Sequence, residues 1–569
     1  MLLVFGPRSL DYDFGPGHPL TPRRFGPGID LLRAVGAEPG LAPEPASDEE
    51  LLWCHERRYL DAVRRFSLDP FGFPEFGIGE GGDCPPFGGM HEASAAVAGG
   101  SLRAVEAILR GDVEHAQHPG GGLHHAMSER ASGFCIYDDP AIAIARARGD
   151  GLRVMYIDLD VHHGDGVQAI HSDDPGVLTC SFHETGRALF PGTGDVDEVG
   201  VGVAAGTSVN VPMPPGTGEG AWLEAVNLLL PELAAAFAPD LIVSQHGADS
   251  HAWDPLAHLN VTTTAHGAAA RLVDTLAHRH ARGRWLATGG GGYDAYRVVP
   301  RTWALTWLAC AHREVPETMP RAWRDRWAAE AARYGQSPLP ERFEDGPNAG
   351  LLFDAAQAAV EERAAGVATL VRRVMVPRLV QVGRDRGWWD PLAPVASAMP
   401  GASAGIGAPA IGIGAPAILT DVDAATWARL TLAPWVVAPA DPQAAHALLL
   451  AGLADGLRVT AAAVGSSVVG LAVSRVEGAN EELLALGVEP GHRRHGLAGA
   501  LLQAHASPER ASTAVITLAE RDVLEPLERS VRGSIARRLL QAAGYRIESA
   551  TGAGRTVDPA AIVARREPA

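Results

Sequence analysis

The chain has 569 residues, of which 46% are hydrophobic and 20% charged, with a formal net charge of −19 at pH 7. A chain of this length exceeds one hydrophobic core, so we expect at least two domains. The negative charge excludes sequence-independent binding to nucleic acid, which requires a basic face, and disfavours anionic membranes. The five cysteines are widely spaced and form no C-x-x-C pair, which indicates reduced thiols in a cytoplasmic protein.

Apolar runs typical of β-strands alternate with helical patterns from about residue 90 to 310. The expected strands are 153–157, 177–182, 240–244 and 285–288, and the expected helices are 93–109, 221–237 and 268–278. A further, interrupted helical region extends from 303 to 379. This alternation predicts an α/β fold in which helices cover both faces of an open, mostly parallel sheet.

An uncharged segment rich in Gly, Ala and Pro, from Pro391 to Thr420, contains a near-repeat at 405–411 and 412–418. Its hydropathy imitates a membrane span, but repeated Pro and Gly break helices and large apolar side chains are scarce. We therefore interpret the segment as a linker. The resulting prediction is a domain at 1–385, a linker at 386–419 and a smaller α+β domain at 420–569, with no membrane-spanning segment.

The stretch from Val154 to Gly166 carries the strongest functional signal. An apolar run with β-branched residues leads directly into a cluster of three aspartates and two histidines. Open α/β sheets build their sites at the carboxyl ends of strands. Asp160 and His162 are two residues apart, so on an extended backbone both side chains point to the same side and can reach one cation.

Further motifs lie in loops or just after expected strands. His124 and His125 form a pair on a glycine-rich loop, Asp249 lies in the sequence Gln-His-Gly-Ala-Asp, and Tyr293 follows four consecutive glycines. Consecutive glycines cost much backbone entropy, which is expected where the chain must pass close to another group. Each motif alone also fits an ordinary loop, but their combination in this order favours one catalytic site.

Together these motifs resemble the arginase–deacetylase superfold. Within it they resemble the zinc-dependent, class I-like histone deacetylases, in particular the bacterial acetoin-utilisation (AcuC) branch. The resemblance covers about residues 10–380. It implies that Asp160, His162 and Asp249 bind the metal. The catalytic residues that it implies are His124, His125, Tyr293 and the carboxylates behind the two histidines, Asp158 and Asp165, respectively.

The same resemblance implies how a substrate would bind. The implied substrate-binding residues are Asp83, Gly133, Phe134, Phe190 and Leu256. Of these, the glycine and the two phenylalanines match a narrow channel around an acyl-lysine stem, and the aspartate matches a rim carboxylate that holds the substrate backbone. Arg24 matches an arginine that lines an internal acetate channel.

The chemistry of these residue types agrees with amide hydrolysis. Two aspartates and one histidine leave positions open on a metal, as a hydrolytic site requires and a structural site does not. His125 is the expected general base and then general acid, while His124 holds the water and stabilises charge, each oriented by its carboxylate. Tyr293 is expected to donate a hydrogen bond to the developing oxyanion.

The predicted activity is removal of acetyl groups from lysine side chains of proteins, with Zn²⁺ or Fe²⁺, and a monovalent cation such as K⁺, as cofactors. The resemblance points to acetoin or acetate metabolism, with acetylated acetyl-CoA synthetase as a candidate substrate. Hydrolysis of acetylpolyamines or other small acetylated amines is the alternative. Arginase-like two-metal chemistry is disfavoured because Gly164 stands where a bridging carboxylate is needed.

A second motif lies in the C-terminal region. A strand expected at 483–488 precedes an Arg- and Gly-containing loop and a helical pattern, an arrangement that presents backbone N–H groups to an anion. With the preceding hairpin at 459–464 and 468–473, it resembles GNAT N-acetyltransferases and implies binding of acetyl-CoA. The implied cofactor-binding residues are Val488, Arg493, Arg494, Gly496 and Ala498. Leu540 stands where many members carry a catalytic tyrosine, so an acetyltransferase and a non-catalytic acetyl-CoA sensor both remain open.

Overall fold

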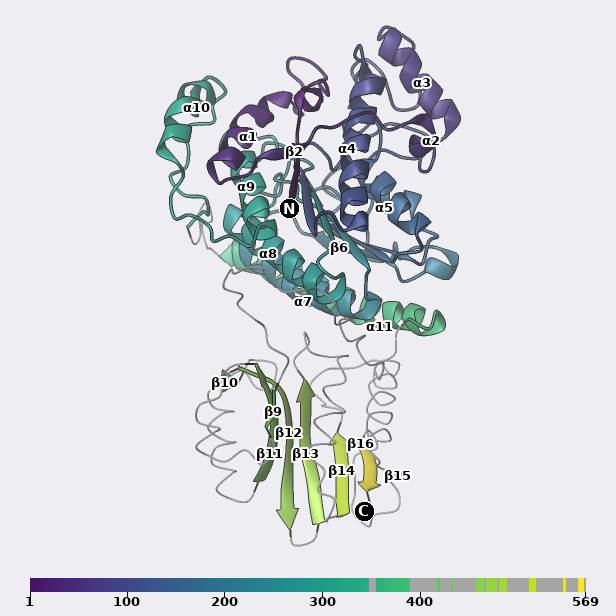
Figure 1. Cartoon of the computed structure of the whole chain (residues 1–569), viewed down its shortest axis with the longest axis vertical. Helices are drawn as coiled ribbons and strands as arrows, with labels where there is room; N and C mark the ends of the chain where they lie inside the picture. Colours follow the sequence, from purple (N-terminus) through teal and green to yellow (C-terminus); the bar gives the residue numbers. More distant parts are fainter. Residues whose placement is uncertain are drawn as a thin grey trace. The chain divides into compact units, whose positions relative to one another are not determined.

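The structure is a computed structural model, which describes residues 1–346 and 355–388. Beyond these residues it describes the backbone of strands between 417 and 566. The chain divides into two units, Met1–Trp388 and Trp389–Ala569 (Figure 1).

The first unit is built on an open sheet in which neighbouring strands are parallel. Its strands are β1 (Leu2–Val4), β2 (Pro39–Leu41), β3 (His115–His118), β4 (Val154–Asp158), β5 (Val177–Glu184), β6 (Ser208–Met213), β7 (Leu241–Gln245) and β8 (Trp285–Thr288). Their order in the sheet is β2-β1-β3-β8-β7-β4-β5-β6. Because β8 and β7 lie between β3 and β4, the carboxyl ends of these strands are neighbours. The predicted open parallel sheet is confirmed.

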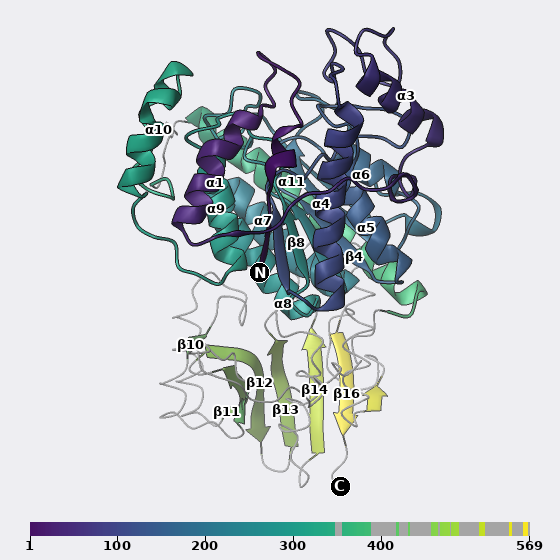
Figure 2. The same cartoon turned by 45° about the horizontal axis from the view of Figure 1, so that its top comes forward.

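Helices cover both faces of this sheet. The helices of this unit are α1 (Phe25–Ala34), α2 (Asp48–Leu51), α3 (Arg57–Leu68), α4 (Met90–Arg110), α5 (Asp139–Gly149), α6 (Asp165–Ile170), α7 (Glu219–Phe237), α8 (Thr263–His280), α9 (Val299–Cys310), α10 (Arg321–Arg333) and α11 (Ala355–Asp385). Helices α4 and α5 pack against one face, whereas α9, α8, α7 and α11 pack against the other (Figures 1 and 2). The sheet is therefore the middle of three layers.

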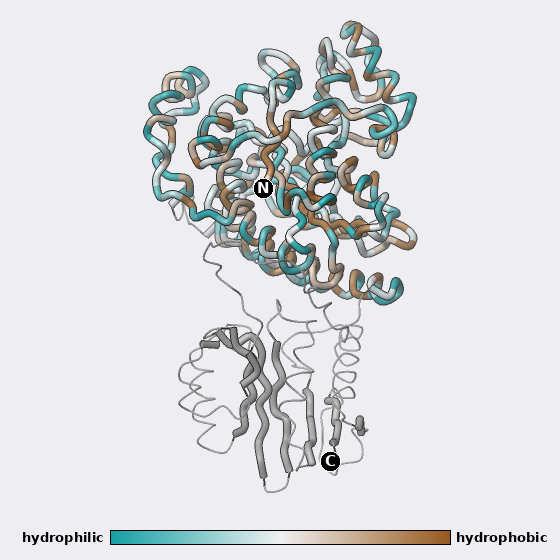
Figure 3. The backbone as a smooth tube through the Cα atoms, in the orientation of Figure 1, coloured by the Kyte–Doolittle hydropathy of each residue, from teal (hydrophilic) through white to brown (hydrophobic). Residues whose placement is uncertain are grey.

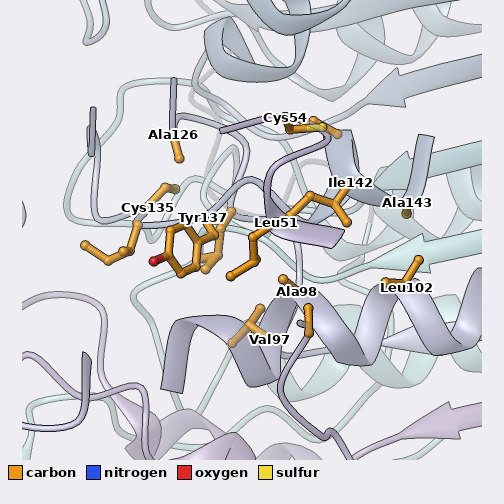
Figure 4. Close-up of a cluster of buried hydrophobic side chains, with 14 of the residues drawn as sticks. Leu51, Cys54, Val97, Ala98, Leu102, Ala126, Cys135, Tyr137, Ile142 and Ala143 are labelled. Atoms are coloured by element: carbon orange, nitrogen blue, oxygen red, sulfur yellow. The ribbon is translucent and has the colours of Figure 1, made fainter. Parts of the chain in front are cut away.

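A large part of the core lies between the sheet and the α4–α5 layer. Val97 and Leu102 of α4 lie near Ile142 of α5, with the buried ring of Tyr137 beside them (Figure 4). Small alanines on both helices let their backbones approach closely. Hydrophobic residues also run through the central strands (Figure 3), as expected for parallel strands that are buried on both faces.

The expected strands and helices of this unit are all present, with ends that shift by a few residues. Helix α8 begins at Thr263, earlier than the periodicity predicts, because the Thr262 side chain accepts a hydrogen bond from the Ala265 N–H at 3.3 Å and caps the helix. The polar strand β3, His-Ala-Gln-His, was not expected, although its residues are buried. Two of its polar side chains make buried contacts: the Gln117 amide nitrogen donates to the Trp303 carbonyl at 3.0 Å, and His118 Nδ1 lies 2.8 Å from the Ser101 hydroxyl oxygen.

Among the described residues, one helix, α7, is long and apolar enough to cross a membrane by length and composition. It packs against α8, β5 and α11, and its Trp222, Leu229 and Leu233 are fully buried. The side chain of Glu361 on α11 accepts hydrogen bonds from the Gly218 and Ala221 N–H groups, at 2.7 and 2.9 Å, and so caps α7. Helix α7 is therefore a core helix of the first unit.

The second unit contains a mixed sheet of order β15-β16-β14-β13-β12-β11-β9, with β10 paired to β12. Its strands are β9 (Ala417–Leu419), β10 (Thr431–Leu432), β11 (Leu457–Val464), β12 (Ser467–Glu477), β13 (Asn480–Val488), β14 (Ala511–Thr517), β15 (Arg546–Glu548) and β16 (Ala561–Arg566). The strands expected at 459–464, 468–473 and 483–488 lie within β11, β12 and β13. Val488 ends β13, whereas Arg493, Arg494, Gly496, Ala498 and Leu540 lie outside the described residues, as does most of the expected linker.

Candidate active site

The candidate site lies at the carboxyl ends of neighbouring strands β3, β8, β7 and β4. The loop after β3 carries His124 and His125, that after β8 carries Tyr293, that after β7 carries Asp249, and that after β4 carries Asp160 and His162. Segments that are far apart in the sequence meet here because parallel strands all end at one edge of the sheet. The structure thus brings together the residues that the sequence analysis assigned to one site.

The metal-ligand candidates form a tight, buried group. The ligand atoms of Asp160, His162 and Asp249 lie within 4.8 Å of one another. Nδ1 of His162 is 3.2 Å from Oδ1 of Asp160 and 3.2 Å from Oδ2 of Asp249. Burial alone would lower the pKa of His162, but hydrogen bonds to the two carboxylates outweigh it and raise this pKa to about 10. A divalent cation can take the place of the proton that this site attracts.

The surrounding chain fits the carboxylates closely. Oδ2 of Asp160 accepts hydrogen bonds from the Gln245 amide and from the Gly291 N–H, both at 2.8 Å. Oδ1 of Asp249 accepts one from the Val161 N–H at 3.0 Å. A Cβ atom at Gly291 would lie 1.9 Å from Oδ2 of Asp249, so only glycine leaves room for this carboxylate. Two oriented oxygens and one imidazole nitrogen are a donor set that suits Zn²⁺ or Fe²⁺.

Each histidine of the pair is held by a carboxylate. Nδ1 of His124 is 2.8 Å from Oδ2 of Asp158, and the Tyr156 hydroxyl donates to the same oxygen at 2.8 Å. Nδ1 of His125 is 2.6 Å from Oδ1 of Asp165. These contacts fix the orientation of both rings, so that their Nε2 atoms are the ones available for chemistry.

The two histidines differ in proton affinity. Burial lowers the pKa of His124, but the charges of Asp158 and Asp160 outweigh this and raise it to about 9. For His125, burial and the neighbouring His124 lower the pKa to about 4, in spite of Asp165. The charges of Asp158 and Asp160 thus favour the protonated form of His124, whereas burial beside His124 favours the neutral form of His125. The second histidine can accept a proton, while the first presents a positive charge.

A narrow pocket opens above the histidine pair, and Phe134 and Tyr293 are among the residues that line it. Their rings meet edge to face, with centroids 6.0 Å apart, and Phe190 contacts His125 in the same manner at 5.0 Å. Gly133 has a φ of +51°, and a Cβ there would lie 2.5 Å from the His125 ring. Burial raises the pKa of Tyr293 well above its usual value, so its hydroxyl remains a donor.

The other expected site residues lie around this pocket. The exposed Asp83 accepts a hydrogen bond from the Gly133 N–H at 3.4 Å. The Leu256 N–H donates to Asp254 at 3.0 Å, and the other oxygen of Asp254 accepts from the Tyr293 N–H at 2.9 Å. Arg24 is buried and donates to the Gly290 carbonyl at 2.6 Å. It lines a small adjoining cavity, which shares Leu20 and Leu123 with the main pocket.

Sequence reasoning missed three residues that orient this site. The Gln245 amide bonds Asp160 and lies 3.4 Å from Nδ1 of His124, Asp254 holds the backbone of Tyr293, and Tyr156 bonds Asp158. Gln245 ends a predicted strand, which places it at the correct edge of the sheet. No pattern in the sequence, however, indicates which polar loop or strand residue will touch a ligand.

Comparison with known proteins agrees with this architecture. The profile of the histone deacetylase domain matches residues 18–310. The acetoin utilization protein AcuC of Bacillus subtilis (strain 168) is 45% identical over 314 residues, which cover 54% of this chain and 81% of that protein. AcuC of Staphylococcus aureus (strain MSSA476) is 37% identical over 349 residues, which cover 60% of this chain and 89% of that protein. The chain belongs to the histone deacetylase family.

Solved structures give the same result. A crystal structure of an HDAC homolog complexed with SAHA aligns with a TM-score of 0.57 and 28% identity, covering 64% of this chain and 99% of that one. An HDAC homolog from Aquifex aeolicus aligns with a TM-score of 0.56 and 28% identity over the same shares. The first unit is thus an amidohydrolase of this family, which implies a divalent-metal site, and Asp160, His162 and Asp249 form a buried cluster that could hold such an ion.

Proposed function

We propose that the first unit removes acetyl groups from lysine side chains of proteins. The observation that carries this proposal is the convergence, on one pocket, of a buried Asp/His/Asp cluster, two carboxylate-bound histidines and a protonated tyrosine. A divalent cation, Zn²⁺ or Fe²⁺, would supply Lewis acidity at this cluster. A monovalent cation such as K⁺ is part of the same proposal.

The protein's own groups provide the proton transfers. The neutral His125 accepts the proton of the attacking water through Nε2 and returns it to the departing amine, because Asp165 holds Nδ1. The protonated His124 keeps the water in place and balances the negative charge that develops. Tyr293 donates its hydroxyl hydrogen to the carbonyl oxygen as that oxygen becomes anionic.

The pocket favours an acetylated amine over a free one. The aromatic residues Phe134 and Phe190 present apolar faces to a hydrocarbon stem, and desolvating a charged ammonium there is costly. Asp83, exposed near Gly133, is placed to accept hydrogen bonds from a peptide backbone. We propose this contact for acetyl-lysine in a polypeptide; acetylpolyamines, whose ammonium groups can pair with the same carboxylate, remain the alternative substrate class.

The decisive experiment compares substrates on the metal-loaded protein. We expect hydrolysis of acetyl-lysine peptides with a kcat/KM above that for acetylpolyamines, and no urea release from arginine. Asp249→Asn should lose the metal ion of the Asp160/His162/Asp249 cluster and the activity, while far-ultraviolet circular dichroism is unchanged, because the substitution keeps the size and shape of the side chain. Asp173→Asn, which changes an exposed carboxylate outside the cluster, is the matched control. Preference for acetylpolyamines, or full activity of Asp249→Asn, would overturn the proposal.

For the physiological role we propose acetoin or acetate metabolism in the cytoplasm, with acetylated acetyl-CoA synthetase as candidate substrate. Support comes from the AcuC relatives, whose name refers to acetoin utilization. Mass spectrometry of acetylated peptides from cells with and without the gene tests this role. An unchanged acetylation level of acetyl-CoA synthetase would exclude it as a substrate.

For the second unit we propose a GNAT-like domain that binds acetyl-CoA. Support comes from the strand pattern: β11, β12 and β13 are antiparallel neighbours, and β13 pairs in parallel with β14 only through residues 480–483. The Val488 end of β13 thus has no β14 partner. Gly496→Asp should abolish acetyl-CoA binding in calorimetry, because a carboxylate would repel the pyrophosphate. An assay for acetyl transfer from acetyl-CoA to amines would then distinguish a catalytic acetyltransferase from a non-catalytic acetyl-CoA sensor.

A further inference from the structure

A second group of metal-ligand side chains lies at the opposite edge of the same sheet. It consists of His115, the first residue of β3, Asp274 and His278 on α8, and His312, just after α9. Their ligand atoms lie within 4.8 Å of one another. The catalytic histidines follow the carboxyl end of β3, whereas His115 is at its amino end, about 10 Å away along the strand.

The distances within this His/Asp cluster are those of a coordination shell. His278 Nε2 is 3.1 Å from His115 Nε2 and 3.0 Å from His312 Nε2. Oδ1 of Asp274 is 3.0 Å from His312 Nε2, 3.4 Å from His115 Nε2 and 3.5 Å from His278 Nε2. A tetrahedral site with zinc–ligand bonds of about 2.0–2.1 Å separates neighbouring ligands by about 3.3–3.4 Å.

Hydrogen bonds alone do not account for this convergence. An imidazole nitrogen carries one proton or one lone pair, in the plane of its ring, and can make one good hydrogen bond. Nε2 of His278 nevertheless faces two other imidazole nitrogens and a carboxylate oxygen. Nδ1 of His115 is buried with no hydrogen-bond partner, so the polar contacts of that ring are all at its Nε2 end. One cation would satisfy all four atoms at once.

The backbone at His312 is a second, independent observation. His312 has a φ of +52°, the left-handed conformation that favours glycine. It occupies the first position after the cap of α9, where its N–H donates to the Ala309 carbonyl and the next N–H, of Arg313, donates to the Leu308 carbonyl. A histidine in this glycine position costs conformational energy. That cost is explained if its side chain is needed where it lies.

We propose that His115, Asp274, His278 and His312 bind a structural Zn²⁺ that joins β3, α8 and the end of α9. Three imidazoles and one carboxylate form a closed tetrahedral set, unlike the open set at the catalytic site. Asp274 and His278 are one helical turn apart, so α8 presents both to the same ion. His115 is buried, whereas His278 and His312 are exposed enough for a cation to enter from solvent. A surface hollow of about 390 Å³ beside His115 and His312 opens this route near the chain end marked N in Figure 2.

Metal content of the full chain tests the proposal directly. After loading with Zn²⁺ and desalting, we expect about two ions per chain, because the catalytic and the structural group each hold one. Asp274→Asn and Asp249→Asn should each retain about one, and the double variant none. Asp112→Asn is the matched control: Asp112 lines the same hollow but bonds Arg110 at 2.9 Å, so this variant should keep both ions. Equal zinc content in wild type and Asp274→Asn would overturn the proposal.

A second variant separates a metal site from a hydrogen-bonded cluster. His312→Gly removes one ligand but relieves the left-handed backbone. After treatment with a chelator, the Tm of His312→Gly should equal or exceed that of the wild type. Adding Zn²⁺ should raise the Tm of the Asp249→Asn protein, but not that of the double variant His312→Gly/Asp249→Asn. If the histidines are joined by hydrogen bonds alone, His312→Gly should lower the Tm of the chelator-treated protein. Zn²⁺ should then raise the Tm neither of the protein with His312 nor of the variant, and this result would contradict the proposal.

Activity distinguishes this proposal from the proposed function. Asp274→Asn leaves the catalytic residues in place, so its kcat/KM on acetyl-lysine peptides at saturating Zn²⁺ should stay within about twofold of wild type. Co²⁺ added to the Asp249→Asn variant should give the intense visible absorption of a tetrahedral site, and Asp274→Asn in that background should remove it. Absence of that absorption would count against the structural site even if deacetylation is found.

Discussion

At the scale of single residues, the candidate active site requires glycine at positions where a side chain would collide with the metal-binding carboxylates. Gly291 lies against both carboxylates of the metal cluster: an added Cβ would be 1.9 Å from Asp249 Oδ2 and 2.9 Å from Asp160 Oδ2. The neighbouring Gly290 has a φ of +108°. The run of glycines is therefore a close-approach segment, as the sequence predicts.

Gly291→Ala should consequently displace Asp249 and weaken metal binding. Loss of a well-oriented ligand environment typically costs about 10- to 100-fold in metal affinity or activity, and we expect a fall of that size in kcat/KM. Zinc titration and peptide kinetics measure the two effects. Gly149→Ala, where a Cβ meets no atom within 4 Å, should behave as the wild type. If Gly291→Ala also bound zinc and hydrolysed peptides as the wild type does, the Asp249 carboxylate would be free to move, and metal binding would not depend on glycine at position 291.

Tyr293→Phe removes one hydroxyl from the same pocket. Loss of an oxyanion donor lowers kcat by about 10²–10³, whereas the ring contact with Phe134 is kept. We therefore expect a large decrease of kcat on acetyl-lysine peptides with little change in KM. A decrease of less than about threefold would remove Tyr293 from the mechanism.

At the scale of elements, buried polar contacts join loops to the helices that support the site. Arg301 on α9 donates to Asp345 at 2.7 Å, and both side chains are almost fully buried. The other oxygen of Asp345 contacts His251, in the loop after β7, at 3.0 Å, and accepts from the Thr263 hydroxyl at the start of α8 at 2.8 Å. One carboxylate thus links α8, α9 and the loop that carries Asp249.

This carboxylate makes stability depend on acidity. Burial alone would raise the pKa of Asp345, but the hydrogen bond to His251 and the charge of Arg301 hold it well below its usual value. The interactions of the Asp345 carboxylate therefore contribute fully to the free energy of unfolding above the unfolded-state pKa of about 4. This contribution is lost as the pH falls below that value.

Asp345→Asn should lower the free energy of unfolding at pH 7 by about 3 kcal/mol, because it leaves the Arg301 charge buried without its counter-ion. The loss of stability between about pH 4 and pH 2 should be smaller in the variant than in the wild type. Urea unfolding across this range measures both. Asp325→Asn, which breaks the exposed pair with Arg321, should cost less than about 1 kcal/mol. Identical acid sensitivity of wild type and Asp345→Asn would contradict the assignment.

At the scale of the whole molecule, the two units are predicted to fold separately. Met1–Trp388 has its own three-layer core. The half-buried Trp388 packs against that core, since its ring lies 6.1 Å from the Phe237 ring and the Arg153 guanidinium lies 5.6 Å from it.

A protein that ends at residue 388 should be soluble and deacetylate peptides with a kcat/KM within about twofold of the full chain. A protein that ends at 385, the boundary expected from sequence, lacks Trp388 and should have a lower Tm. Size-exclusion chromatography, thermal unfolding and peptide kinetics compare the two. An insoluble or inactive 1–388 protein would mean that the units share an interface.

The sequence alone determines those parts of the site that depend on local order. The sequence identifies Asp160 and His162 because their spacing on an extended backbone places the two side chains together. It identifies Tyr293 because the glycines before it indicate that the backbone passes close to another group. The parallel sheet follows from the alternation of apolar strands and amphipathic helices. The resemblance to histone deacetylases then assigned roles to residues whose function the local sequence pattern did not indicate.

Only the tertiary structure decides which strands are neighbours. The insertion of β8 and β7 between β3 and β4 brings Gln245 against Asp160 and Asp254 against the Tyr293 backbone. It also gathers His115, Asp274 and His312 at the other edge of the sheet, although nothing local relates them. Hydrophobic periodicity fixes which side of an element is buried, but the contacts between polar side chains depend on strand order and helix packing, which no short stretch of sequence contains.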